Sequence, residues 1–554
     1  MKSRVLIVLS LIVLLGAVLR FIVLDQVPPS LNWDEVSHGY NAYSILKTGK
    51  DEWGQRFPRT SFRAFGDYKL PLYIYLTAPL TVFGLNEWTI RAVSALSGIG
   101  AIIFTFLLVQ KLFNNPMLSA LSSLLLAVSP WHFILSRAAF EANLALFLVI
   151  LATFLFLLGL KKEKFLPVAA IFYGLSLYSY NSAKIFVPLL IITFVLLYRK
   201  EIFAKMRFSA LALIIFLLMF LPHLILLPSQ EGQARFYWST ILDPGAIAQI
   251  NKARSVSNLP QPLPRFVHNK GTYFLSHFFS NWLSHYSPQF LFFQGSSHYQ
   301  YSIPGRGVMP LLEAPFLLIG FVALLFWRKK GVFLILIWFF LGPIAAAVTR
   351  DSPNVLRSIL ILPSLQVISA FGVLTIGKFP QKFGRQYYLG FLTVFLFLLL
   401  MSAFGFFTDY FGKYRKDYSF AWQYGYKQVA NFVKKNYDNY DQIIMTKKYG
   451  EPHEFLLFYL GWPPEKYQSD PNLIRFYRSN WYWVDRFDKF YFVNDWQIPK
   501  EENGEWKLES GGVIPTEGKT LLVTSPENHP PNWYYLETVN FLDGKPAFEI
   551  YTSS

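Results

Sequence analysis

Two adjacent carboxylates, Asp34 and Glu35, follow directly on the first long apolar segment of the chain. Carboxylates are costly to keep where a membrane helix meets water, so residues of this kind are expected to have a function there. A carboxylate within hydrogen-bond reach of a hydroxyl acts as a general base. We therefore predict that Asp34 does chemistry, with Glu35 as the second catalytic candidate. In the alternative, one carboxylate caps the following helix and the other is solvated.

Basic residues near the ends of apolar segments are suited to bind a phosphate. A guanidinium grips a phosphate through two parallel hydrogen bonds, and a lysine offers a compact positive charge. The candidate phosphate ligands are Lys69, Arg137, Arg357, Arg63 and Arg91. Ordinary alternatives remain open: Lys69 and Arg357 also fit anchors at the membrane interface. Arg137 also fits a helix-surface salt bridge with Glu141.

Further polar residues at the same ends complete a candidate substrate cavity, namely His38, Asp67, Tyr68, Glu141, Tyr180, Asn181 and Arg350. The histidines of the long loop after residue 228 do not have the spacing of a compact ligand set, so no metal site is predicted. No cofactor is predicted to be required, and nothing in the sequence supports a divalent metal. The chain also lacks a Gly-rich phosphate loop and a Gly-x-Ser-x-Gly nucleophile motif.

The composition is typical of a polytopic membrane protein. Of 554 residues, 53% are hydrophobic and only 15% are charged, and apolar runs of about 20 residues recur. The formal charge of +17 would suit nucleic acid, but 55 phenylalanines and a mean hydropathy of +0.32 argue against it. The absence of cysteine excludes disulfides, thiolate zinc sites and cysteine nucleophiles.

The apolar runs predict about eleven transmembrane helices. Lysines and arginines gather in the linkers on the side of the N-terminus, for example at 161–164 and 328–330, which predicts a cytoplasmic N-terminus in the plasma membrane. The Asp34 loop then lies outside. Two stretches, 35–47 and 71–84, are too short to span and are predicted to be interfacial helices. The expected spans are 5–24, 88–112, 117–134, 142–160, 165–179, 184–198, 208–227, 309–327, 331–348, 355–376 and 386–407.

Two domains are expected. Residues 1–409 form a mainly α transmembrane domain, with a first outer loop at 25–87 and a long outer loop at 228–308 that resembles an interfacial lid. Residues 410–554 have the shorter apolar runs of a soluble, extracytoplasmic α/β domain. A helix is predicted at 419–435, with Ser419 as its cap. The predicted strands are 441–446, 489–494, 519–524, 534–540 and 546–551.

The order of these residues resembles a known family, the lipid-carrier-dependent glycosyltransferases of the GT-C type, which includes the protein O-mannosyltransferases and the aminoarabinose transferases. The motifs that carry the resemblance are Asp34-Glu35 after the first span, Lys69 before Pro71-Leu72-Tyr73, Gly84 with Asn86-Glu87 and Arg91, and Ser129-Pro130 before Arg137. One departure is Leu70, where many members have a second proline. Another is the lack of an Asp-x-Asp pair after the first span, which argues against the metal-dependent oligosaccharyltransferase branch.

The resemblance implies a GT-C fold and transfer of a sugar from a polyprenyl phosphate donor to an acceptor hydroxyl of a glycan, lipid or protein on the outer face. It implies that Asp34 is the base and that Lys69 and Arg137 bind the donor phosphate. With one base required, displacement with inversion is the simplest mechanism. The expected partners are this donor, the acceptor and membrane lipids, and not nucleic acid.

Two other classes of protein remain as alternatives. A transporter or flippase with an outer sensing domain should have broken helices and ionisable groups near the middle of the membrane. The predicted spans have no charges at their centres. A non-catalytic membrane scaffold would not need Asp34, Lys69 and Arg137 together. The lack of central charges argues against the transporter, and the presence of all three residues argues against the scaffold, so the enzyme is favoured.

Overall fold

A computed structural model describes residues 3–229, 231–233, 239–501, 504–515 and 517–553. Positions 230 and 234–238 of the predicted long outer loop lie outside the described residues. The chain divides into two compact units. The first unit is Met1–Ile22, Ser94–Ser136 and Phe140–Phe407. The second unit is Val23–Val93, Arg137–Ala139 and Thr408–Ser554. The first outer loop thus belongs to the same unit as the C-terminal segment.

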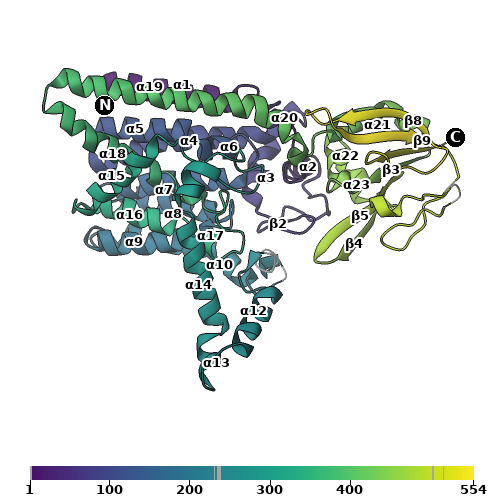
Figure 1. The fold of residues 1–554 in the computed structure, drawn as a ribbon, viewed down its shortest axis with the longest axis horizontal. Helices are drawn as coiled ribbons and strands as arrows, with labels where there is room; N and C mark the ends of the chain where they lie inside the picture. The colour runs from purple at the N-terminus through teal and green to yellow at the C-terminus, as the bar shows by residue number, and fades with distance from the viewer. Residues whose placement is uncertain (1–2, 230, 234–238, 502–503, 516, 554) are drawn as a thin grey trace. The chain divides into compact units, whose positions relative to one another are not determined.

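The described part of the first unit is helical (Figure 1). Helix α7 packs on α8, α8 on α10, and α15 on α18. Helices α15 and α18 approach each other closely because Gly372 has no side chain. A Cβ at this position would lie only 1.8 Å from the Phe316 carbonyl oxygen. The helices are α1 (Ser3–Phe21), most of α4 (Glu87–Phe113), α5 (Pro116–Val128), α6 (Pro130–Leu135), α7 (Glu141–Gly159), α8 (Phe165–Leu177), α9 (Ala183–Phe203), α10 (Met206–Leu226), α12 (Pro244–Ser255), α13 (Leu263–Val267), α14 (Lys270–Ser284), η2 (Gln289–Gln294), α15 (Glu313–Leu325), α16 (Lys330–Leu341), α17 (Ile344–Ala347), η3 (Ile359–Ile361), α18 (Ser364–Gln381) and α19 (Arg385–Asp409).

Several of these helices have the length and composition of membrane spans, which confirms the prediction of a multi-pass membrane protein. Within the described residues, 7 helical segments are long and apolar enough to cross a membrane. Shorter apolar helices α5, α8 and α15, together with the kinked α9, occupy the positions of the remaining predicted spans. The exact count of eleven stays a prediction. The segment predicted at 71–84 is a short apolar helical stretch, Pro71–Phe83.

The long outer loop contains helices α12, α13 and α14, which project from the other helices of the first unit (Figure 1). Helix α14 has no buried residue. Its apolar side chains Leu275, Phe279 and Leu283 are more than half exposed. Exposed apolar side chains on a projecting helix suit contact with lipid at the interface. This geometry is compatible with the predicted lid, whose role stays a prediction.

The second unit is built on a seven-stranded mixed sheet with the strand order β4-β5-β6-β3-β7-β9-β8. Strand β3 pairs in parallel with β6 and β7, and the other pairs are antiparallel. The strands are β4 (Ile474–Arg478), β5 (Trp481–Phe487), β6 (Phe490–Val493), β3 (Gln442–Thr446), β7 (Thr520–Thr524), β9 (Pro546–Thr552) and β8 (Tyr534–Asn540). The other elements are α2 (Trp33–Thr48), β1 (Phe62–Arg63), β2 (Tyr68–Lys69), α3 (Pro71–Thr77), η1 (Ala78–Phe83), the start of α4, η4 (Tyr410–Tyr414), α20 (Arg415–Asp417), η5 (Ser419–Trp422), α21 (Tyr426–Asn436), η6 (Tyr437–Asn439), α22 (Pro452–Leu460), α23 (Pro464–Gln468) and η7 (Asp495–Gln497).

All five predicted strands exist, each within one residue of its predicted bounds. The helix predicted at 419–435 is wrong in its first half. Ser419 begins the short 3-10 helix η5, and α21 begins only at Tyr426. The chain breaks between them because Gln423 and Gly425 have φ values of 54° and 113°, which an α-helix cannot contain. The β4–β5 hairpin and helices α22 and α23 were not predicted.

Candidate functional site

The first turn of α2 positions the two predicted carboxylates. Asn32 caps the helix: its side chain accepts a hydrogen bond from the Glu35 amide at 2.9 Å, and Glu35 accepts one from the Asn32 amide at 3.1 Å. This reciprocal capping box fixes where the helix begins. The side chain of Asp34 is 34% exposed, whereas that of Glu35 is 1% exposed. Asp34 is therefore the more accessible of the two carboxylates.

Lys69 is held opposite Asp34 by a small hairpin. Strands β1 and β2 pair in an antiparallel register that sets Phe62 against Lys69, and Pro71 then begins α3, where a proline is well suited to the first turn. The Lys69 Nζ donates to Asp34 Oδ1 in an ion pair. The ammonium also lies 5.4 Å from the centre of the Phe65 ring. Residues 35 positions apart in sequence thus meet as one acid–base pair.

Glu35 is engaged in a buried network. Its carboxylate accepts hydrogen bonds from Arg91 Nε at 2.9 Å, from Arg91 Nη2 at 3.1 Å and from the Ala139 amide at 2.9 Å. Arg91 also donates to carbonyl oxygens of the segment that leads into α2: those of Leu24, Pro28 and Ser30. This network ties three chain segments together, so its geometry favours a structural role for both side chains.

Arg137 lies in the same unit and is also buried. Its Nε and Nη2 donate to the Val27 carbonyl at 3.2 and 2.6 Å, and its guanidinium lies 5.0 Å from the Phe411 ring centre. Burial lowers the pKa of Arg137 to about 10, which still leaves the guanidinium charged near neutral pH. The aromatic ring stabilises this buried cation.

The other predicted residues of the second unit, among them His38, Asp67 and Arg63, lie in different environments. His38 is buried beside Tyr73, and burial, assisted by Lys69, lowers its pKa to about 4, so the imidazole is neutral. Asp67 lies in the turn of the β1–β2 hairpin, where it accepts from the Tyr68 amide at 2.8 Å. The Arg63 guanidinium lies 5.0 Å from the ring centres of both Trp53 and Tyr482.

The remaining predicted residues belong to the first unit, where four of them gather at one end of α7, α8 and α9. The Ser179 hydroxyl donates to the Glu141 carbonyl at 2.7 Å, next to Tyr180. The Ser182 hydroxyl, next to Asn181, donates to the Arg357 carbonyl at 2.9 Å. The Arg357 side chain donates to Thr349 Oγ1 at 2.9 Å. Arg350 forms an exposed salt bridge with Asp243 at 3.2 Å.

An aromatic cluster of Trp33, Phe65 and Trp481 was not predicted from the sequence. The Trp33 ring lies 5.7 Å from Phe65 and 6.2 Å from Trp481, measured between centres. Glycines make room for both indoles: a Cβ on Gly66 would lie 2.0 Å from Trp481, and one on Gly450 would lie 2.3 Å from Trp33. The Trp481 indole donates to Glu451. Two features of the sequence could have indicated this cluster: Trp33 is next to Asp34, and three aromatic residues follow one another at 481–483.

Within the described residues, no group of three or more His, Asp or Glu side chains is placed to hold a metal ion.

Residues 70–226 match the family model of the dolichyl-phosphate-mannose-protein mannosyltransferases. No curated protein matches the sequence significantly. Solved structures are similar in fold. ArnT from Cupriavidus metallidurans bound to undecaprenyl phosphate is 12% identical, with 100% of this chain and 98% of that chain covered and a TM-score of 0.53.

The archaeal oligosaccharyltransferase AglB from Archaeoglobus fulgidus, in complex with an inhibitory peptide and a dolichol-phosphate, is 13% identical, with a TM-score of 0.52. The alignment covers 82% of this chain and 63% of that chain, so the chain spans less than two thirds of that relative. The predicted resemblance to the GT-C type and the predicted fold class are confirmed. The family model is named for a mannosyltransferase and the archaeal structure is that of an oligosaccharyltransferase, and both names agree with the predicted enzyme class.

Proposed function

We propose, from the premise that this chain is a membrane glycosyltransferase of the GT-C type, that it transfers a sugar from a polyprenyl phosphate donor to an acceptor hydroxyl on the outer face of the membrane. The observation that carries this proposal is the ion pair of Lys69 with the partly exposed Asp34. The two similar structures that contain undecaprenyl phosphate and dolichol-phosphate support a donor of this chemistry.

The pair suggests how donor binding prepares the base. A donor phosphate that approaches Lys69 offers its ammonium a second anion, which releases the Asp34 carboxylate from its ion pair. Asp34 then accepts the proton of the acceptor hydroxyl while the acceptor oxygen bonds to the anomeric carbon. The bond from that carbon to the phosphate oxygen breaks, and the polyprenyl phosphate leaves with the electron pair. Fixed cations stabilise this developing charge without reorganisation, and one displacement inverts the anomeric centre.

In this proposal Glu35 and Arg91 position Asp34 and take no part in the chemical step. Their buried ion pair, together with the hydrogen bond from the Ala139 amide, holds the first turn of α2 against the residues around Arg137. The direction of the Asp34 side chain depends on that turn. We therefore assign the base to Asp34 alone, and the donor phosphate to Lys69 and Arg137 of the same unit. Arg357 of the first unit stays a donor-phosphate candidate from the sequence.

Replacement of the phosphate ligands is expected to weaken donor binding. A charge-assisted hydrogen bond contributes about 1.5 to 3 kcal/mol, so Lys69→Ala, Arg137→Ala and Arg357→Ala should each lower donor affinity by roughly 10-fold or more. The measurement is a titration of the purified variants with a polyprenyl phosphate. Lys545→Ala serves as the control, because the Lys545 side chain is 81% exposed. Unchanged donor affinity in all three variants would remove these residues from the site.

The sidedness of the membrane is tested by labelling of single cysteines, which is clean because the chain has none. We expect a membrane-impermeant maleimide to label Asn439→Cys in intact cells and to label Lys162→Cys only after the cells are opened. The reason is the excess of basic residues in the linkers on the N-terminal side. The reverse pattern of labelling would put the Asp34 loop in the cytoplasm.

The transporter and the scaffold are separated from the enzyme by one assay, the transfer of a radiolabelled sugar from a polyprenyl phosphate donor in detergent. Transfer by the parent protein supports the proposal. If the folded parent protein transfers no sugar from any prenyl donor, but moves a lipid-linked sugar across a vesicle membrane, it is a flippase.

A further inference from the structure

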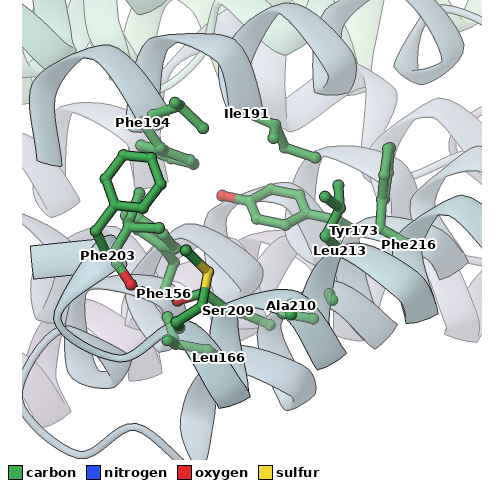
Figure 2. Close-up of a pocket in the computed structure, with 16 residues that line it drawn as sticks. Phe156, Leu166, Tyr173, Ile191, Phe194, Phe203, Ser209, Ala210, Leu213 and Phe216 are labelled. Carbon is green, nitrogen blue, oxygen red and sulfur yellow. Dashed lines mark hydrogen bonds between the residues drawn. The ribbon is translucent and has the colours of Figure 1, made fainter. Parts of the chain in front are cut away.

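A cavity of about 340 Å³ lies among α7, α8, α9 and α10 of the first unit. Its walls are apolar side chains that face a common space, among them Phe156, Phe194, Leu213 and Phe216 (Figure 2). This volume lies within the range of about 300 to 1,000 Å³ that is typical of small-molecule sites.

The cavity is almost entirely apolar, and its two lining hydroxyls already donate within the protein. The Tyr173 hydroxyl is already hydrogen-bonded to Thr153 at 2.8 Å, and the Ser209 hydroxyl donates to the Ile202 carbonyl at 2.9 Å. A polar ligand would lose hydrogen bonds to water without replacing them. The cavity therefore suits a hydrocarbon chain.

Helix α9 is broken near the cavity. The helix is interrupted at Tyr198, with φ −120° and ψ 22°. Ile202, Phe203 and Met206 follow this break and line the cavity at the end where α9 is succeeded by α10. Phe203 is labelled in Figure 2. Phe203 and Met206 are both more than half exposed. The cavity is thus bounded by a short connector, with α10 as an outer wall that has only Phe216 and His223 buried.

Basic residues flank this end of the cavity on both sides. The linker before Leu166 contains Lys161, Lys162 and Lys164, and the segment around Ile202 contains Arg199, Lys200, Lys205 and Arg207. The acidic residues of the same segments are Glu163 and Glu201, and Glu201 pairs with Lys330. Seven basic against two acidic residues leaves an excess of five positive charges. Such a cluster at the end of membrane helices attracts anionic lipid headgroups.

The cavity is at the wrong end of α9 for the donor phosphate. Its lining residues on this helix run from Ile191 to Phe203, whereas Ser182 holds Arg357 at the other end. The part of α9 before the break, residues 183–198, is about 24 Å long. A headgroup near Lys200 therefore lies far from Arg357.

We propose that this cavity binds an acyl chain of an anionic glycerophospholipid, whose headgroup phosphate lies among the basic residues of the two flanking segments. The cavity supplies the apolar half of the site, and the basic cluster selects the headgroup. The lipid is a bound component of the protein rather than its donor. The site does not depend on sugar transfer.

The test is native mass spectrometry of the full chain, released from mild detergent after addition of phosphatidylglycerol or of phosphatidylcholine with the same acyl chains. We expect one retained phosphatidylglycerol, bound about 10-fold more tightly than phosphatidylcholine. Ala210→Trp fills the cavity and should lower this retention about 10-fold. Ile214→Trp is the matched control, because Ile214 is exposed on the same helix but does not line the cavity. Lys200→Gln combined with Arg207→Gln should weaken phosphatidylglycerol and leave phosphatidylcholine unchanged.

A second measurement needs no variant. Phosphatidylglycerol with a diazirine in its acyl chain should crosslink to residues of α7, α8, α9 or α10 that line the cavity. Equal retention by the two tryptophan variants, equal binding of the two lipids, or crosslinks confined to residues that do not line the cavity would each overturn the proposal. Displacement of phosphatidylglycerol by undecaprenyl phosphate would also overturn it, since the cavity would then belong to the donor. None of these outcomes depends on whether the protein transfers a sugar.

Discussion

Asp34→Asn is expected to slow sugar transfer by about 10²- to 10⁴-fold, because the amide keeps the shape of the carboxylate but cannot accept the acceptor proton. Donor affinity should not fall. Lys69 loses the anion with which it pairs, so its ammonium is left for the donor phosphate. Slower transfer with unchanged or tighter donor binding is the signature of a lost base. The pH profile of the variant should also lose its acidic limb, since that limb reports the base.

The measurement is the initial rate of transfer from a radiolabelled polyprenyl phosphate sugar, with donor affinity measured separately. Asp438→Asn is the matched control, because it makes the same change at an exposed position of the same unit. An elution profile in detergent shows whether each variant is folded. If folded Asp34→Asn transfers sugar at the parent rate, Asp34 is not the base.

Loss of the Glu35 charge is expected to destabilise the protein rather than to affect one step of the reaction. Both members of the Glu35–Arg91 pair are almost fully buried, at 1% and 0% exposure. Removal of one partner leaves an uncompensated buried charge, which costs about 3 to 5 kcal/mol. Glu35→Gln and Arg91→Met should each lower the thermal unfolding midpoint. Replacement of both residues by apolar ones should cost less than the sum of the single changes, because contacting residues are coupled.

The control for this prediction is Glu201→Gln, which breaks an exposed pair with Lys330 whose side chains are 37% and 51% exposed. Exposed pairs contribute about 0 to 1 kcal/mol, so the unfolding midpoint should hardly move. The same variants decide between two roles of Arg91. If Arg91 binds the donor phosphate, as its place in the sequence predicted, a folded Arg91→Met protein loses donor affinity at unchanged stability. If Arg91 serves the buried network instead, the thermal unfolding midpoint of Arg91→Met falls.

The membrane class and the fold class could be predicted because they depend on local properties. A run of apolar residues long enough to span a bilayer is visible in the sequence, and alternating patterns marked the five strands of the sheet that begin at 442, 490, 520, 534 and 546. The hairpin of β4 and β5 was missed because its residues are rich in both aromatic and charged side chains, which weakens the alternation. The break between η5 and α21 was missed because it depends on positive φ at Gln423, a residue with no special preference for it.

For the site, the sequence alone determined the set of candidates, because the residue types and their places at the ends of spans define which chemistry is available. It put Asp34 ahead of Glu35 as the base, but it could not predict what each of these neighbouring carboxylates contacts. Only the tertiary structure decided that Asp34 meets Lys69 while Glu35 meets Arg91. The physical reason is that one step along an α-helix turns a side chain by about 100°. Adjacent carboxylates therefore face different surroundings, and what surrounds each depends on segments that lie 35 to 104 residues away along the chain.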